Sequence, residues 1–234
     1  MPFTFSHTLV VIPWLKNKNF SATALVLGAM APDFEFFFRM RTQSEISHTW
    51  HGLFILDLPL AMLVAFFFHG ILKKTLLLNS PFFIQSRLTT LIQTNWLDFL
   101  VANPFRVLIS FLAGAATHFF LDAFTHSDGF FVMRIPSLQQ NLLSFPMYEW
   151  LQYGSSVVGL IGIAIYFFNI PKDESVVPQI DYKFWWCALL CSLIFLGLRF
   201  TLVQGWTKIG DIIVGALSSI ILALLVSSVL FKRR

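Results

Sequence analysis

Long apolar runs dominate the pattern of this chain. They cover 52–72, 106–126, 150–169, 184–204 and 210–231. Each run reaches the roughly 20 residues that a helix needs to cross the hydrocarbon core of a bilayer. None shows the strict polar–apolar alternation of a strand, and a backbone in lipid must satisfy its own hydrogen bonds, so each run predicts an α-helix. The pattern predicts an all-α fold, a polytopic integral membrane helix bundle with five clear spans.

The first part of the chain is less regular. Residues 4–15 form an apolar run that is short for a span, and a polar turn at 16–19 follows it. Residues 20–38 are apolar again, but Pro32 interrupts them, and proline kinks or ends a helix. We interpret 1–38 as a helical hairpin whose first arm is re-entrant, interfacial or crosses a locally thinned bilayer.

These elements account for nearly the whole chain. We expect six to seven helices in a single membrane-embedded domain over 1–234. In this domain the hairpin precedes core helices in 52–126, and three further spans follow in 150–231.

The composition supports a membrane protein. Hydrophobic residues make up 56% of the chain and charged residues only 12%, whereas charged residues make up about 25% of an ordinary soluble domain. A soluble chain of this size cannot bury so much apolar surface. The composition excludes a soluble globular protein, a disordered chain and a nucleic-acid binder, so the expected partner is membrane lipid.

The positions of lysine and arginine predict the orientation. The chain ends in Lys232-Arg233-Arg234, and basic residues favour the cytoplasmic side. Counting spans back from this end places the 170–183 and 73–105 loops and the hairpin tip, all of which carry lysines, on the same side. We expect a multi-pass protein of the cytoplasmic membrane with a cytoplasmic C-terminus. The ends of the hairpin then face outside.

Three ionisable residues share one predicted helix. His118, Asp122 and His126 are spaced i, i+4, i+8, so they fall within an arc of about 80° on one helix face. Ionisable groups inside an apolar helix are costly and usually functional. We interpret the three as part of a metal or catalytic site. A structural polar network that locks helices together is the alternative.

Other candidate ligands are expected at the same outer face. His48 and His51 open the next helix with i, i+3 spacing, Asp33 follows the break at Pro32, and the hairpin returns His7 towards Asp33. Neutral imidazoles suit zinc, iron, nickel or copper, and a carboxylate at a helix break can bridge metals. The alternatives are interfacial histidines and a carboxylate that faces water.

Supporting residues are predicted at the start of the 150–169 run. Gln152, Ser155 and Ser156, together with His51, are candidates for contacts that orient the ligands, as is common around metal sites. Helix packing through these small residues is the alternative for the serines.

Several motifs together resemble a known family. They are Pro2–His7, Gly28–Glu35, Ser47–Thr49, Gly114–His118 with Asp122 and His126, and Leu151–Ser156. They resemble the bacterial membrane proteins grouped as domain of unknown function 4184, over about residues 1–230.

The resemblance extends more weakly to enzymes. The layout is similar to inner-membrane metal-dependent hydrolases, which pair a Pro-Asp with histidine motifs and a His-x-x-x-Asp helix. More distantly, the order of the Asp and His residues looks like that of the ligands in zinc-dependent phospholipases C and single-strand nucleases. The chain lacks their N-terminal Trp ligand and their second His-x-x-x-Glu helix. The resemblance implies a bacterial inner-membrane protein with a hydrolytic metal site.

We therefore expect a membrane-embedded metal-dependent hydrolase that acts on a lipid or lipid-linked phosphoester at the outer membrane face. The expected ligands of a divalent metal, with zinc the expected identity, are His7, Asp33, His48, His118, Asp122 and His126. The candidate catalytic residues are Asp33, Glu35 and Asp122. A metal or proton transporter and a non-catalytic membrane scaffold are the alternatives. The collection of polar residues on one side and the lack of a visible inverted repeat disfavour a transporter.

Overall fold

The computed structural model describes residues 3–202 and 208–232 and is 75% helical. Five helices in this part of the chain are long and apolar enough to cross a membrane. They are Trp50–Leu78, Pro104–Thr125 (α8), Met147–Phe168 (α10), Tyr182–Leu202 (α11) and Ile209–Leu230 (α12). The predicted all-α, multi-pass membrane fold is confirmed, and each span overlaps a predicted run.

Two details of the prediction need comment. The first span is longer than the predicted 52–72, because it continues through α3 (Trp50–Gly52), α4 (Leu58–Phe67) and α5 (Lys73–Leu78), joined by the π-helical segments η3 (Leu53–Asp57) and η4 (Phe68–Leu72). The predicted end of the 184–204 run and the basic residues Arg233 and Arg234 lie outside the described residues.

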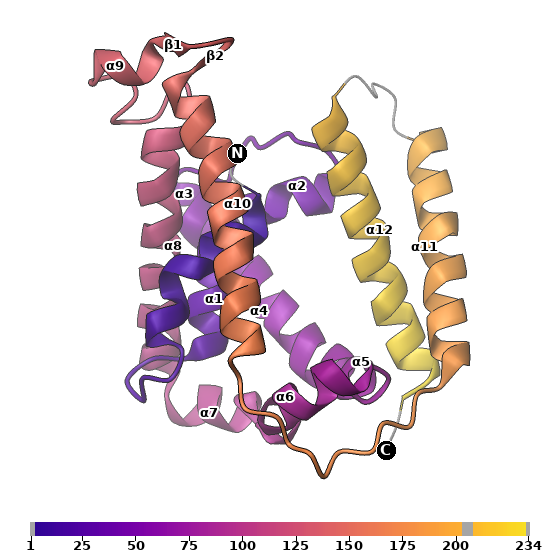
Figure 1. Ribbon diagram of the computed structural model, residues 1–234. Helices are drawn as coiled ribbons and strands as arrows, with labels where there is room; N and C mark the ends of the chain where they lie inside the picture. Colours follow the sequence, from indigo (N-terminus) through magenta and orange to yellow (C-terminus); the bar gives the residue numbers. More distant parts are fainter. Residues whose placement is uncertain (1–2, 203–207, 233–234) are drawn as a thin grey trace. The chain divides into compact units, whose positions relative to one another are not determined.

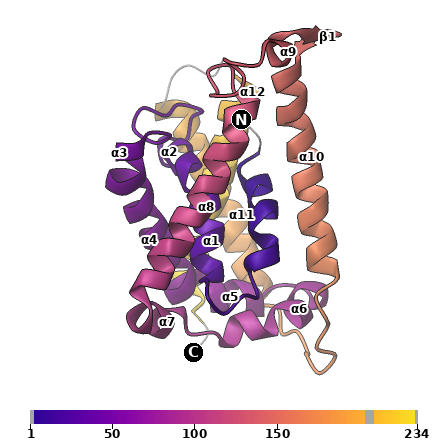
Figure 2. The ribbon, with the colours of Figure 1, turned by 90° about the vertical axis from the view of Figure 1, so that its left-hand side faces the viewer.

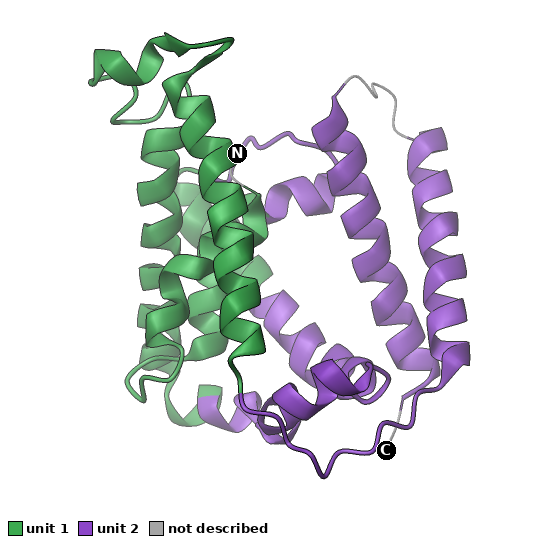
Figure 3. Ribbon diagram, in the orientation of Figure 1, with its two compact units in different colours: residues 1–33, 48–61, 100–170 green, residues 34–47, 62–99, 171–234 purple. Residues whose placement is uncertain are grey.

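The chain divides into two compact units, each assembled from separate segments (Figure 3). Unit 1 contains residues 1–33, 48–61 and 100–170, and unit 2 contains residues 34–47, 62–99 and 171–234. The Trp50–Leu78 helix contributes to both units. The single-domain organisation stays a prediction.

Unit 1 begins with the predicted hairpin. Its first arm is a 3-10 helix, η1 (Thr4–Trp14), and its second arm is α1 (Ala22–Met30) followed by the short 3-10 turn η2 (Ala31–Asp33). The two arms pack through a buried cluster of Val11, Leu25 and Ala29. Beyond α8, this unit contains the short helix α9 (Pro136–Gln139), a two-stranded hairpin of β1 (Asn141–Leu142) and β2 (Phe145–Pro146), and α10.

Helices α1 and α8 of unit 1 lie side by side and run parallel (Figures 1 and 2). The backbone N–H of Ser21 donates to Ser110 Oγ, and farther along His118 Nδ1 donates to the Ala29 carbonyl, each over 2.8 Å. Both pairs are separated by 89 residues, so the two helices keep one register along the contact. A β-carbon at Gly28 would overlap the Phe111 carbonyl, and one at Gly114 would overlap the Leu25 carbonyl. Small residues therefore permit the close approach.

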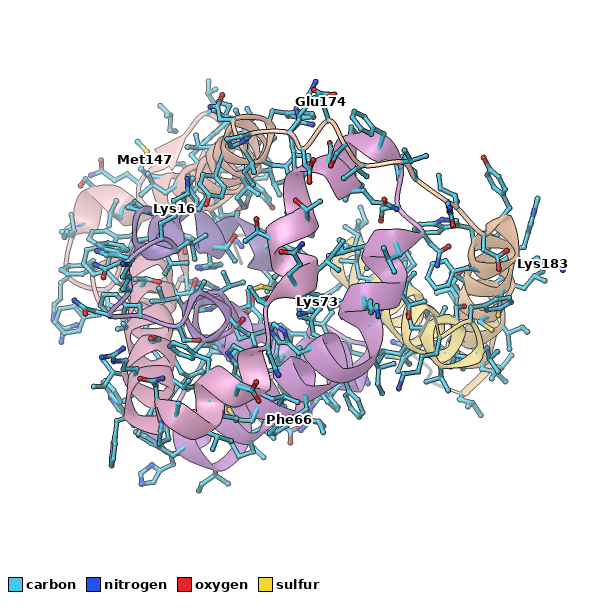
Figure 4. All side chains as sticks on the ribbon, turned by 90° about the horizontal axis from the view of Figure 1, so that it is seen from below. Lys16, Phe66, Lys73, Met147, Glu174 and Lys183 are labelled. Atoms are coloured by element: carbon cyan, nitrogen blue, oxygen red, sulfur yellow. The ribbon has the colours of Figure 1, made fainter. Side chains whose placement is uncertain are left out.

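Unit 2 contains α2 (Phe34–Arg39), α6 (Phe82–Gln93), the first part of α7 (Trp96–Ala102), α11 and α12. Buried charges in this unit bind backbone groups. Arg199 donates to the Met40 carbonyl through Nε at 2.9 Å and NH2 at 2.8 Å. Lys73, labelled in Figure 4, donates to the Thr94 carbonyl. These contacts satisfy cations that would otherwise be costly to bury.

Candidate metal centre

Asp122 is the hub of a cluster of imidazoles in unit 1. Its Oδ2 lies 3.1 Å from His118 Nε2 and 3.4 Å from His48 Nε2. Its Oδ1 lies 3.7 Å from His7 Nε2 and 3.5 Å from His126 Nδ1. Four histidines that are far apart in the sequence thus meet around one carboxylate: His7, His48, His118 and His126.

Asp33 adds a second carboxylate to this cluster. Its Oδ1 lies 3.5 Å from His48 Nε2 and 3.6 Å from His118 Nε2. The ligand atoms of Asp33, His48 and His118 all lie within 4.8 Å of one another, as do those of His7, His118 and Asp122. All six residues predicted as metal ligands therefore gather in one place.

Most of these groups are buried and lack ordinary partners. His7, Asp33 and His118 have 0% exposure, and Asp122 has 8%. Six of their polar atoms make no hydrogen bond with any described residue: both ring nitrogens of His7, Nε2 of His118, Oδ1 of Asp33 and both carboxylate oxygens of Asp122. Buried polar atoms are normally paired, and an unpaired one costs about 1–3 kcal/mol. These atoms face one another at 3.1–3.7 Å without hydrogen-bond geometry, an arrangement that a shared cation would satisfy.

The donor distances fit a metal ion. Zinc bonds of about 2.0–2.2 Å place the corners of a tetrahedron about 3.3–3.6 Å apart. The contacts of Asp33 and Asp122 with the histidines span 3.1 to 3.7 Å, a range centred on that value. Nitrogen and carboxylate oxygen are also donors that zinc and neighbouring transition metals accept. The residues therefore fit a divalent cation.

Two contacts behind the cluster orient its donors. His118 Nδ1 lies 2.8 Å from the Ala29 carbonyl. A carbonyl can only accept, so Nδ1 carries a proton and Nε2 is directed at the carboxylates. The Thr4 hydroxyl donates to Asp33 Oδ2 over 2.6 Å and leaves Oδ1 facing His48 and His118. Contacts of this kind fix ligand geometry in metal sites.

The role of Thr4 was not foreseen from the sequence, although a signal for it exists. Thr4 and His7 are three residues apart in η1, and side chains at i and i+3 eclipse each other in a 3-10 helix. Both are buried. Recognition of the first arm as a 3-10 helix would have placed the two side chains on one face.

His48 reaches the cluster from outside a helix. The Thr49 side chain caps α3 by accepting from the Gly52 N–H over 2.9 Å, so His48 precedes the helix and has a positive φ of 64°. The helical spacing that predicted a shared face for His48 and His51 does not apply. His51 is exposed and does not join the grouped donors, so its supporting role stays a prediction.

His126 also differs from the prediction. Helix α8 ends at Thr125, and His126 is its C-cap with extended backbone, φ −115° and ψ 146°. The three residues therefore do not form one helical stripe. The chain turns His126 back so that Nδ1 still lies 3.5 Å from Asp122 Oδ1. The side chains of His126 and His48 are 26% and 27% exposed, which makes them the open side of the cluster.

Glu35 is not placed as a general base. Its carboxylate accepts from the backbone N–H groups of Glu45, Ile46 and Ser47 over 2.8–3.1 Å, from the Ser44 hydroxyl and from Arg39. Burial opposes ionisation, but these donors outweigh it and lower the pKa of Glu35 to about 2. A saturated carboxylate with this pKa is a poor proton acceptor at neutral pH. Glu35 instead anchors the 44–47 loop through these hydrogen bonds, and its catalytic role stays a prediction.

The predicted support from α10 is indirect. Ser156 Oγ accepts from the Phe3 N–H over 2.9 Å, next to Thr4, and so anchors the start of η1. Ser155 and Ser156 donate to the Gln152 carbonyl within their own helix. Ser156 therefore positions the arm that carries Thr4 and His7, while the hydrogen bond between Ser155 and the Gln152 carbonyl stays within α10.

Comparison with known proteins identifies a family. The family model described as "Domain of unknown function (DUF4184)" matches residues 1–229. The chain belongs to this family. The match spans both units and every donor of the cluster, in agreement with the resemblance noted in the sequence. Comparisons with curated proteins and with solved structures found no match.

Proposed function

We propose that this DUF4184 protein is a membrane-embedded, metal-dependent hydrolase. One observation carries the proposal: buried carboxylate and imidazole atoms without hydrogen-bond partners lie at the mutual distances of metal ligands. The proposed ligands are His7, Asp33, His48, His118, Asp122 and His126. We expect zinc or a similar divalent cation.

The chain and the cation have separate tasks in this proposal. A bound divalent cation supplies Lewis acidity, which lowers the pKa of a coordinated water and stabilises charge on a phosphoryl oxygen. The buried carboxylates of Asp33 and Asp122 offset the positive charge, and the Ala29 carbonyl and Thr4 hydroxyl hold the donors in place. The partly exposed side at His48 and His126 provides the approach for substrate and water.

The position in α8 supports a lipid substrate. Asp122 lies three residues before the end of this span, or about 4.5 Å along the helix axis. A group at that depth is near the boundary between hydrocarbon and headgroups. We propose a lipid or lipid-linked phosphoester as substrate. By the distribution of lysine and arginine, we place the site at the outer face of the bacterial inner membrane and the C-terminus in the cytoplasm.

The two alternatives fit the contacts less well. A scaffold whose polar groups only lock helices together would pair its buried donors in hydrogen bonds, whereas the carboxylates and imidazoles here face one another at 3.1–3.7 Å without hydrogen-bond geometry for six buried atoms of the described residues. A transporter needs polar groups along a path. The buried positions of α8 before the site are mostly small or apolar, and Ser110 is occupied by the hairpin.

Metal analysis of a matched pair of variants tests the proposal. We expect detergent-purified wild type to contain stoichiometric metal by inductively coupled plasma mass spectrometry, and His48→Ala to lose metal. His51→Ala, only three residues away but exposed, should retain the wild-type content. Metal-free folded wild type after reloading with zinc, manganese or iron would contradict the proposal. With metal established, release of phosphate or headgroup from lipid phosphoesters tests the reaction.

A further inference from the structure

We infer that the 127–146 segment is a lipid anchor that inserts apolar side chains among the phospholipid headgroups. The segment connects the spans α8 and α10 within unit 1 and contains α9, β1 and β2. This inference goes beyond the proposed function and does not depend on a bound metal. Four features carry it: exposed apolar side chains, a leucine in a strained turn, the depth of the hairpin, and an arginine placed for a phosphate.

Large apolar side chains cover much of the surface of this segment. Those with exposures of 38% to 85% are Phe130, Met133, Ile135, Leu142, Leu143 and Phe145. Single exposed hydrophobic residues are ordinary, but a group of them marks a surface that binds protein or membrane. The backbone is held by its own contacts: Gln139 Nε2 donates to the Val132 carbonyl over 2.9 Å, and the Met147 N–H donates to the Gln140 carbonyl over 3.0 Å. The segment therefore presents these side chains on a folded support.

The turn between β1 and β2 holds a leucine in a conformation that favours glycine. Leu142 pairs with Phe145, so Leu143 and Ser144 form a two-residue turn. Leu143 has a positive φ of 60°, which costs free energy in a residue with a β-carbon. Its side chain is 85% exposed, so contacts with the described residues offset little of this cost. A leucine at this tip is therefore explained by a contact outside the chain.

Trp150 fixes the level of the hairpin in the bilayer. It lies near the start of the α10 span, and tryptophans at the ends of spans sit among the headgroups. Its Nε1 donates to the Leu142 carbonyl over 2.9 Å, and its ring meets Phe145 edge-on, with centroids 6.2 Å apart. Helix α10 has 22 residues, or about 33 Å, which fills a hydrocarbon core of about 30 Å. The hairpin at its start (Figures 1 and 2) is therefore at the level of the headgroups.

Arg134 is placed to contact a lipid phosphate. Its guanidinium carbon lies 3.7 Å from the centre of the Phe130 ring, and NH1 donates to the Phe130 carbonyl over 3.0 Å. A guanidinium has five N–H donors and binds phosphate through parallel hydrogen bonds. Arg134 is exposed, and the adjacent Met133 is 62% exposed. A cation beside exposed apolar side chains matches a phospholipid, which carries its phosphate above its acyl chains, better than it matches a second copy of this chain.

The segment also packs on the helix that carries the candidate site. It begins directly after His126, and the Phe131 N–H donates to the Ala123 carbonyl of α8 over 3.0 Å. The Phe131 ring stacks on Phe124, with centroids 4.1 Å apart. Insertion of the segment among the headgroups therefore keeps the open side of the cluster at the same level.

Spin-label accessibility in the full-length protein tests the anchor. A nitroxide is attached at Ser144→Cys in a Cys187→Ala, Cys191→Ala background, in nanodiscs of phosphatidylethanolamine and phosphatidylglycerol. Oxygen concentrates in lipid, whereas a nickel chelate stays in water. We expect the ratio of oxygen to nickel collisions to be several times higher at Ser144→Cys than at Glu174→Cys, a control position in an exposed polar loop. Equal ratios at the two positions would overturn the anchor.

Substitutions at Leu143 separate lipid contact from folding. Leu143→Gly relieves the positive φ but removes the apolar side chain, so the ratio at Ser144→Cys should fall towards that of the control position while the unfolding temperature stays near wild type. Leu143→Met should keep the wild-type ratio. An unchanged ratio in Leu143→Gly would overturn the insertion of this side chain. Few collisions with either reagent would mean that protein, such as a second copy, covers the tip, and would also overturn the lipid anchor.

Substitutions at Arg134 test the phosphate contact. Arg134→Gln removes the charge and should lower the ratio at Ser144→Cys. Arg134→Lys keeps the charge but loses the planar guanidinium, so its ratio should lie between those of wild type and the glutamine variant. Equal ratios in all three proteins would overturn the phosphate contact, whereas the Leu143 variants decide the apolar insertion separately.

Discussion

The Thr4 hydroxyl donates a hydrogen bond of 2.6 Å to Asp33 Oδ2. This contact joins the first turn of η1 to the end of the second hairpin arm, and both residues are buried. It also decides which oxygen of Asp33 is free to face His48 and His118. Thr4 thus orients a proposed ligand from the first turn of η1.

Thr4→Val should therefore weaken metal binding. Valine keeps the shape of threonine but removes the donor, and loss of an orienting hydrogen bond costs about 10- to 100-fold in metal affinity. Competition with a calibrated chelator measures the change. Thr4→Ser, which keeps the hydroxyl, should stay near wild type. Equal affinities for the valine and serine variants would show that the hydroxyl does not orient Asp33.

Gly114→Ala should destabilise the contact between α1 and α8. The added methyl group would overlap the Leu25 carbonyl, and overpacking typically costs about 1–3 kcal/mol. Because His118 takes its orientation from Ala29 on α1, metal affinity should fall as well. Thermal unfolding in detergent measures the stability. Gly154→Ala is the matched control, since a β-carbon there meets nothing within 4 Å; similar losses in both variants would contradict the close packing.

Removal of the metal should lower the thermal stability of the protein. A ligand that binds only the folded state stabilises it by about 2.7 kcal/mol at a concentration 100 times its dissociation constant. We expect a chelator to lower the unfolding temperature of wild type and zinc to restore it. His118→Ala should respond to neither addition. A wild-type unfolding temperature that is independent of both would mean that the cluster does not bind metal in the folded protein.

Glu35 should stabilise its loop in a pH-dependent way. Its pKa is lowered from 4.5 to about 2 in the folded protein, so the contribution is fully present above pH 4.5 and is lost as the pH falls towards 2. The protection factors of the Glu45, Ile46 and Ser47 amides, which are corrected for the change of intrinsic exchange with pH, should fall over that range. At pH 7, Glu35→Gln should lower the same protection factors and so speed up exchange relative to wild type.

Glu45→Gln is the control for this experiment. The Glu45 side chain is 57% exposed where it pairs with Arg39, and exposed ion pairs contribute little. Exchange in this variant should stay close to wild type. Unchanged exchange in Glu35→Gln as well would show that the loop does not depend on the buried carboxylate.

The spans could be predicted because lipid imposes one simple requirement. Length and apolar composition located all five, and Pro104 and Lys208 mark helix starts close to the predicted ones. The 3-10 form of the first arm could not be predicted, since apolar periodicity does not distinguish it from an α-helix. The extension of the first span past residue 72 was hidden by Lys73, which is buried against a backbone carbonyl.

The sequence predicted which side chains gather in the cluster better than how the backbone presents them. The free-energy cost of burying ionisable groups pointed to His118 and Asp122. The predicted hairpin placed His7 near Asp33. Errors arose where helical spacing was assumed beyond a helix end. Thr49 caps a helix after His48, and α8 stops before His126. The sequence also does not show that three backbone amides converge on the Glu35 carboxylate.

The parallel register of α1 and α8 also affects how the protein is made. The proposed ligands run from His7 to His126 in the sequence. The hairpin is synthesised well before α8, which supplies His118, Asp122 and the Phe111 carbonyl that lies against Gly28. Until then Asp33 has Thr4 and His48 within reach but not His118. Insertion of α8 beside the hairpin therefore brings the last of the proposed ligands to the cluster, and α10 follows with Ser156, which anchors the start of η1.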